Sequence, residues 1–190
     1  NPYWEGAKIS LYSAGEESIA SMPNIKVGKF ITQVILQNIE VEDIDLSNAT
    51  DLRSAWVQNN PALQKLDLSY STIWGQGDKE TEGNGTYGSS LMVLGCPILK
   101  EIKLPEKNEL KAYRIDIECL DALETFDMSN VKMVAELSIG DLNKDFNLVY
   151  PELTIFYSED GYAGTYFACS ENTFYRESTQ AFLKANYTDI

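Results

Sequence analysis

The sequence predicts a β-rich solenoid of irregular coils, with an inserted loop and a C-terminal helical cap. Three observations favour this fold class. One phrase recurs along the chain, short x-apolar-x-apolar pieces alternate with polar turns, and the two ends depart from that pattern. With 190 residues, 44% of them apolar and 23% charged, the chain is long enough to bury a core as a single domain.

The recurring phrase occupies three windows of the sequence. They read AWVQNNPALQKLDLS from Ala55, LMVLGCPILKEIKLP from Leu91 and IDIECLDALETFDMS from Ile115. The places that are apolar in all three windows are Ala55/Leu91/Ile115, Val57/Val93/Ile117, Leu63/Leu99/Leu123, Leu66/Ile102/Phe126 and Leu68/Leu104/Met128. Each window therefore has one side to bury, and stacking the windows on one another buries it.

Each coil is expected to consist of two half-turns. The half-turn that begins at Leu52 is followed by one that begins at Leu63, an offset of 63 − 52 = 11 residues, and a third begins at Val41, another 11 upstream. Two half-turns make a coil of 22 residues. A weaker copy of the phrase, ITQVILQNIEVEDIDLS, begins at Ile31.

Later coils are expected to be longer. The interval from Leu63 to Leu99 is 36 residues, from Leu99 to Leu123 it is 24, and from Leu123 to Leu153 it is 30. The first is explained by an inserted loop at residues 74–90, which is rich in glycine and polar residues as a surface loop is. The last contains GDLNKDFNLVY, which we interpret as a second excursion.

The two ends of the chain are expected to cover the open stack. A strand is predicted at Ala7–Tyr12, and a short helix from Ser178, with Ser178 as its N-cap and with Phe182 and Leu183 facing inward. The predicted division of the single domain is an N-terminal cap at 1–30, repeats at 31–157 and a C-terminal cap at 158–190. Aromatic residues near the C-terminus would either build this cap or stack on sugars: Tyr162, Tyr166, Phe167, Phe174 and Tyr175.

The half-turns resemble a known family of repeats. Leu52-x-x-Ala55-x-Val57-x-x-Asn60 resembles the LxxLxLxxN core of leucine-rich repeats, and DIDLSNATDL and KLDLSYSTI look like the LDVSxNTxL half-turn of bacterial surface proteins of the internalin-like and Bacteroidetes types. The resemblance covers about two-thirds of the chain. It implies that Asn60 bonds the backbone of its turn, although Cys96 and Leu120 stand in the equivalent places.

Charge and residue inventory exclude several kinds of partner and cofactor. The net charge of 15 − 29 = −14 repels phosphate, so nucleic acid is excluded as a partner. No apolar run reaches the roughly 20 residues of a transmembrane segment. Histidine is absent and the three cysteines form no CxxC, so we expect neither a metal nor another cofactor. Residues 78–83 imitate the opening of a calcium loop, but Ser89 stands where a bidentate Glu is required, which favours a solvated loop tip.

The chain is expected not to be an enzyme. Without histidine, neither Ser-His-Asp nor Cys-His activation of a nucleophile is possible, and no phosphate-binding glycine loop is present. The sequence has enough carboxylates for a two-carboxylate glycosidase, but a solenoid presents its acids on an open face and not in a deep pocket.

Cysteines and the N-terminus bear on the location of the protein. Cys96, Cys119 and Cys169 are expected to be small buried residues, and they do not decide the compartment. NPYWEGAKIS is not a signal-like start, and we interpret it as a processed N-terminus. With the family resemblance, this predicts a secreted or cell-surface protein, with lipid anchoring through a removed leader as one route.

Candidate binding residues are those between the apolar strand positions, which would point outward from the repeat sheet. The predicted outward set is Ile35, Trp56, Gln58, Met92, Leu94, Asp116, Glu118 and Ser138. Trp74 and Tyr87 of the inserted loop would join the same surface. Alternatively, this loop or the N-terminal segment covers Trp56 and Met92 and makes them part of the core.

The leading functional hypothesis is a non-enzymatic extracellular module that recognises a protein or peptide through the repeat face. Trp and Met on an exposed sheet are typical anchors of partner surfaces, and the charge of −14 favours a partner with basic patches. The alternatives are a structural spacer or adhesin segment of a cell-surface assembly, and a carbohydrate-binding surface protein.

Overall fold

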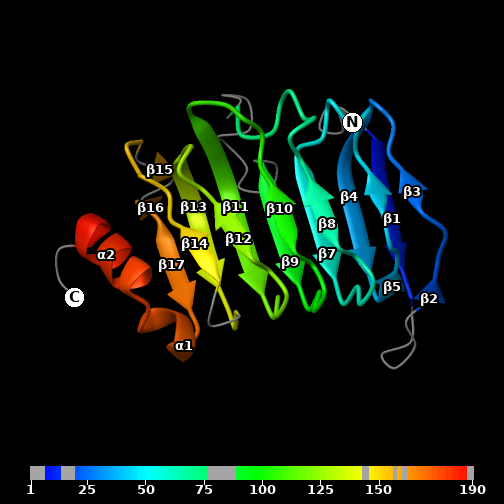
Figure 1. Ribbon diagram of the computed structural model, residues 1–190. Coiled ribbons are helices and arrows are strands. Elements are labelled where there is room, and N and C mark those ends of the chain that lie inside the picture. Colours follow the sequence, from blue (N-terminus) through cyan, green and yellow to red (C-terminus); the bar gives the residue numbers. More distant parts are fainter. Residues whose placement is uncertain are drawn as a thin grey trace.

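Two parallel β-sheets dominate the fold (Figure 1). The computed structural model describes residues 7–13, 20–76, 89–142, 146–155, 158–159 and 162–187. Within them, a seven-stranded sheet contains, in spatial order, β1 (Ala7–Tyr12), β4 (Ile31–Gln37), β7 (Ser54–Gln58), β9 (Ser90–Leu94), β11 (Leu110–Glu118), β13 (Val131–Ile139) and β17 (Tyr166–Cys169). A four-stranded sheet contains β14 (Asn147–Val149), β12 (Thr125–Asp127), β10 (Glu101–Lys103) and β8 (Lys65–Asp67).

Shorter elements complete the described part of the chain. The short strands pair as β2 (Ala20–Ser21) with β5 (Ile39–Glu40), β3 (Ile25–Lys26) with β6 (Ile44–Asp45), and β15 (Ser158–Glu159) with β16 (Tyr162–Ala163). Only the last of these pairs is antiparallel. Helices α1 (Glu171–Phe174) and α2 (Glu177–Asn186) follow β17 and lie at the end of the sheets opposite β1 (Figure 1). The predicted strand at Ala7–Tyr12 is confirmed, and it pairs directly with β4.

From β7 to β14 the chain alternates between the two sheets, and we call each passage out and back a circuit. Successive circuits lie in register, because Leu66 of β8 pairs with Ile102 of β10, and Phe126 of β12 with Leu148 of β14. The last interval is therefore 148 − 126 = 22 residues. The predicted interval of 30 residues, with Leu153 as the next equivalent, is wrong. The NLV of GDLNKDFNLVY is β14, so this part is no excursion, and residues 143–145 of the segment lie outside the described residues.

The core lies between the facing sides of the two sheets. Alternate residues of the large sheet point into it, and every aligned apolar place of the three windows is buried: Ala55, Leu91, Ile115, Val57, Val93, Ile117, Leu63, Leu99, Leu123, Leu66, Ile102, Phe126, Leu68, Leu104 and Met128. Burying one such side chain stabilises the fold by about 1.5–3 kcal/mol. The predicted stacking is thus confirmed at these positions, and Leu148 of β14 belongs to the same core.

A left-handed residue follows four successive strands of the large sheet. The φ angles are 54° at Asn38, 53° at Asn59, 63° at Gly95 and 53° at Cys119. Asparagine and glycine adopt this conformation most readily. The position of Cys119 in such a turn leaves its side chain exposed, so the expectation that all three cysteines are buried is wrong for Cys119. Cys96 is buried, Cys169 is partly buried, and all three are free thiols.

Asn60 supports the turn that follows β7. Its Oδ1 accepts hydrogen bonds from the backbone N–H groups of Val41 at 3.2 Å, Ala62 at 3.1 Å and Leu63 at 3.2 Å. The side chain is fully buried. The role predicted for Asn60 is confirmed, and the bond to Val41 joins this turn to the segment that follows β5.

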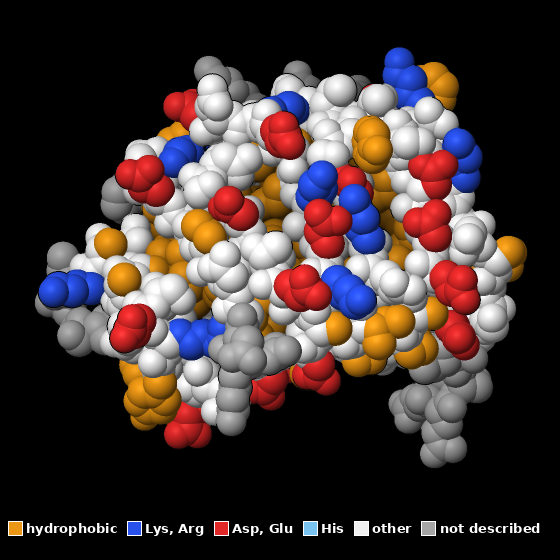
Figure 2. All heavy atoms as spheres, in the orientation of Figure 1, with side chains coloured by type: hydrophobic (Ala, Val, Ile, Leu, Met, Phe, Trp, Pro, Cys, Tyr) orange, Lys and Arg blue, Asp and Glu red, His pale blue; other side chains and the backbone are white. Residues whose placement is uncertain are grey.

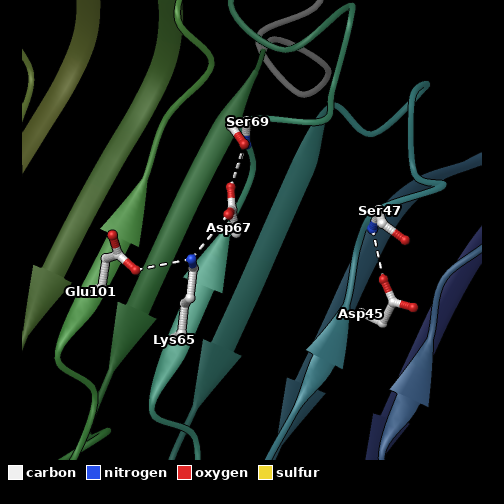
Figure 3. Close-up of polar contacts among 6 residues, drawn as sticks. All are labelled: Asp45, Ser47, Lys65, Asp67, Ser69 and Glu101. Atoms are coloured by element: carbon white, nitrogen blue, oxygen red, sulfur yellow. Dashed lines mark hydrogen bonds and ion pairs between the residues drawn. The ribbon is translucent and has the colours of Figure 1, made fainter.

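Aspartates stabilise the ends of short strands on the four-stranded side. Asp45, Asp67 and Asp127 each accept a hydrogen bond from the backbone N–H two residues later, at 2.9, 3.0 and 2.8 Å. Figure 3 shows two of these turns. Bonds from the Ser47 hydroxyl and amide, together with Lys26 at 3.0 Å, lower the pKa of Asp45 from 3.8 to about 2.

The C-terminal helix covers one end of the core. Phe182 and Leu183 are buried as predicted, and Phe182 stacks on Tyr150 with ring centroids 4.7 Å apart. The helix begins at Glu177 with Arg176 as its N-cap, so the prediction that Ser178 is the N-cap is wrong. The aromatic residues before it divide: Phe167 and Phe174 pack against the core, whereas Tyr166 and Tyr175 are exposed. The side chain of Tyr162 lies outside the described residues.

The ends of the predicted inserted loop belong to the fold itself. Trp74 is fully buried, its Nε1 donates to the Ser90 carbonyl at 3.4 Å, and Ser90 begins β9. The Gly75 N–H donates to Ser89 Oγ at 2.6 Å and so ties the two ends together. The loop prediction is therefore wrong for Trp74, Gly75 and Ser89, which are buried, and for Ser90, which lies in β9. Gln76 is exposed and irregular as predicted, and residues 77–88 lie outside the described part.

The variant Asn60→Ala is expected to be less stable by about 2–4 kcal/mol, because it leaves three backbone donors without their acceptor. Urea unfolding followed by circular dichroism measures the loss. Asn48→Ala is the matched control, since Asn48 is exposed and its side chain makes no described hydrogen bond. Equal stability of the two variants would contradict the role given to Asn60.

The variant Asp45→Asn is expected to lose less stability in acid than the wild type. A folded pKa of about 2 against 3.8 means that the Asp45 carboxylate stabilises the fold above pH 3.8, and that this contribution disappears as the pH falls towards 2. Urea midpoints measured across this range test it, with Asp43→Asn as the control for removing one exposed charge. Parallel acid profiles of the wild type and Asp45→Asn would refute the assignment.

Candidate interaction surface

The outward side of the large sheet carries the predicted row of side chains. Strand pairing places Ile35 beside Trp56, Trp56 beside Met92, Met92 beside Asp116, and Asp116 beside Ser138. These five residues come from five adjacent strands, β4 to β13. The register confirms that they lie side by side, and we call them the central row.

A second outward row runs two residues further along the strands. Gln37, Gln58, Leu94 and Glu118 are register partners in turn, and we call them the end row. Gln37 Nε2 donates to Gln58 Oε1 at 3.1 Å across the β4–β7 pair. Leu94 therefore lies between an amide and a carboxylate, and beside Met92 of its own strand on the same face.

Exposure varies along the two rows. Ile35 and Asp116 are only 7% and 6% exposed, so the expectation that the whole row is solvent-facing is wrong for these two. Asp116 is held by Arg114 Nη2 at 2.8 Å. Trp56, Gln58, Met92, Leu94 and Ser138 are partly exposed, and Glu118 is exposed. Trp56 and Met92 are thus neither core residues nor fully open.

Of the two remaining predicted site residues, the structure describes only Trp74. Trp74 is fully buried in the core and supports β9 from inside, so its assignment to the surface is wrong. Tyr87 lies outside the described residues, as do residues 78–83 of the calcium-loop imitation.

The Trp56 indole has an unsatisfied hydrogen-bond donor. Its Nε1 is buried and has no partner, although the ring as a whole is partly exposed. A buried donor without an acceptor costs roughly 1–3 kcal/mol.

Arg114 and Glu136 belong to the same face and were not predicted. Arg114 Nη2 contacts Asp116 Oδ2 at 2.8 Å, and its Nη1 lies 3.6 Å from Glu136 Oε2. Tyr113 donates its hydroxyl proton to Glu136 Oε1 at 3.2 Å. The available signal was the spacing of Arg114 and Asp116, since residues two apart on a strand share a face.

Glu118 extends over a gap left by glycine. A Cβ at Gly140 would lie 2.2 Å from Glu118 Cγ, so only glycine at this position leaves room for the Glu118 stem. The surroundings are acidic: burial raises the pKa of the Cys119 thiol, and the charges of Glu118, Asp141 and Asp121 raise it further. The outward face therefore changes from apolar at β7 and β9 to acidic at β11.

On the four-stranded side, Lys65 forms ion pairs with two carboxylates. Lys65 Nζ lies 3.3 Å from Asp67 Oδ2 and 3.0 Å from Glu101 Oε2, and both contacts raise the pKa of Lys65 (Figure 3). Figure 2 shows acidic and basic side chains interspersed over the face that it presents. Such exposed pairs contribute little to stability.

The described residues contain no cluster of three or more Cys, Asp or Glu side chains placed to hold a metal ion. Within the same ranges, neither helix has the length and apolarity that crossing a membrane requires. Comparisons with models of protein families, with curated proteins and with solved structures found no match to this chain.

Proposed function

We propose that this chain is a non-enzymatic binding module that recognises a protein or peptide through the outward face of its seven-stranded sheet. The observation that carries the proposal is the in-register neighbourhood of Trp56, Met92 and Leu94 on that face. Large apolar side chains with tryptophan at the centre are the usual anchors of protein interfaces.

The kind of sheet supports the same conclusion. All-parallel sheets nearly always have both faces covered by other elements. Here the core covers one face, and the described helices lie at the end of the sheet beyond β17 (Figure 1). A partner laid on the outward face would give this parallel sheet its second cover.

Preorganisation also favours binding. Each strand of the face is fixed by two neighbours, and Gln37 and Gln58 fix each other. A surface that is already ordered loses little conformational entropy on association, so a few apolar anchors suffice for affinity. The inventory without histidine supports a non-catalytic role.

We further propose that the circuits form a leucine-rich-repeat-like solenoid, with irregular coils and a C-terminal helical cap. The support is the alternation between two parallel sheets, the recurrent left-handed turns and the three bonds of Asn60, which match the LxxLxLxxN resemblance. The same resemblance is the ground for proposing that the protein is secreted or displayed at a bacterial cell surface.

The binding proposal is tested by selecting peptides from a random displayed library on the full chain. Trp56→Ala is expected to weaken the selected peptides about tenfold or more, because a central anchor is lost. Calorimetry measures the affinities, and circular dichroism checks that the variant is folded.

Tyr70→Ala is the matched control, since Tyr70 is an exposed aromatic residue that follows β8 of the other sheet. A folded Trp56→Ala variant that binds every selected peptide as tightly as the wild type contradicts the proposed function. A selection that yields no binder also counts against it.

A further inference from the structure

We infer that the partner carries a lysine or arginine that pairs with Glu118, beside an apolar side chain that packs on Trp56, Met92 and Leu94. The inference rests on the proposed function and adds the chemistry of the partner to it. It follows from how charge is distributed over the outward face.

Glu118 is the acidic side chain of this face that is left without a counter-ion. Asp116 is bound by Arg114 at 2.8 Å, and Glu136 has Arg114 at 3.6 Å and the Tyr113 hydroxyl at 3.2 Å. Glu118 has no ion pair among the described residues, although its side chain is exposed. A basic side chain of a partner can therefore pair with Glu118 directly. To pair with Asp116 or Glu136, it would have to displace Arg114.

The stem and the backbone of Glu118 have close neighbours. Gly140 makes room for the Glu118 stem, since any Cβ there would collide with Glu118 Cγ at 2.2 Å. The backbone next to it is fixed as well, because the Gly95 N–H donates to the Glu118 carbonyl at 3.0 Å and the Cys119 N–H to the Asp141 carbonyl at 2.8 Å. The carboxylate itself is exposed, and its described hydrogen bond is a 4.0 Å contact from the Cys119 thiol, so a partner's cation can reach it.

The apolar anchors lie directly beside this carboxylate. Leu94 is the register partner of Glu118, and Met92 is two residues before Leu94 on the same side of β9. Trp56 is one strand further away, on β7. Adjacent strands are about 4.8 Å apart and two residues along a strand span about 6.6 Å, so Trp56 and Glu118 are separated by about 12 Å.

This separation specifies the partner. In an extended segment about 12 Å corresponds to a basic residue three to four positions from the apolar one, and in a helix to about eight positions. An acidic side chain at that place would face Glu118 and be repelled, as would a nucleic acid backbone. The surface therefore fits a segment that is both apolar and basic, in keeping with the chain's net charge of −14.

A double-mutant cycle tests the pair directly. The probes are the peptides selected on the full chain, each compared with a copy in which its basic residue is replaced by norleucine. On the wild-type chain the replacement is expected to weaken binding about two- to fivefold, the range for an exposed ion pair. On Glu118→Gln the same replacement is expected to have no effect, and Glu118→Lys is expected to prefer peptides with an acidic residue at that place.

The matched control is Glu124→Gln, which removes one exposed carboxylate next to β12 of the other sheet. It is expected to retain the full effect of the norleucine replacement. If that effect is the same on wild type and Glu118→Gln while Trp56→Ala still weakens binding, the inference about Glu118 fails and the proposed function stands. If Trp56→Ala leaves binding intact, the proposed function itself fails.

Discussion

The fixed register between successive parallel strands is the constraint on which the rest of this structure depends. Because side chains alternate across a strand, the pairing that places Ala55, Leu91 and Ile115 side by side in the core also places Trp56, Met92 and Asp116 side by side outside it. A slip of one residue would exchange the two sets. The buried aliphatic rows therefore determine which residues the outward face presents and in what order.

The turns maintain this register. Asn60 bonds both its own turn and Val41 in the segment that follows β5, and left-handed residues at Asn38 and Asn59 end successive strands in the same way. On the four-stranded side, aspartates such as Asp67 close their turns and charges pair locally. The outward face instead carries Trp56, Met92 and Leu94 side by side, next to a Glu118 carboxylate that has no ion pair among the described residues. The contrast is why we place recognition on the seven-stranded sheet.

Periodicity predicted the parts of the fold that repeat. The aligned core positions, the strand at Ala7–Tyr12, the adjacency of the central row and the turn bonded by Asn60 all follow from spacing or from the repeat resemblance. Predictions failed where residues of the same type lie in different environments. By residue type alone, Leu153 was as good a candidate for the next core position as Leu148, which the structure places there. Trp74 stands next to glycine, as a loop residue often does, yet it is buried. The Arg114–Asp116 pair was missed because ion pairing depends on side-chain geometry, which spacing does not specify.

Methionine oxidation tests the central claim most directly, because Met92 lies on the outward face of the seven-stranded sheet and Met128 lies in the core. Met92 is partly exposed on the outward face, whereas Met128 is fully inaccessible. Sulfoxide formation by hydrogen peroxide follows exposure, and mass spectrometry of peptides separates the two residues. The account predicts that Met92 is oxidised much faster than Met128 in the folded chain and that bound peptide slows Met92 alone. Equal rates at the two residues would contradict it.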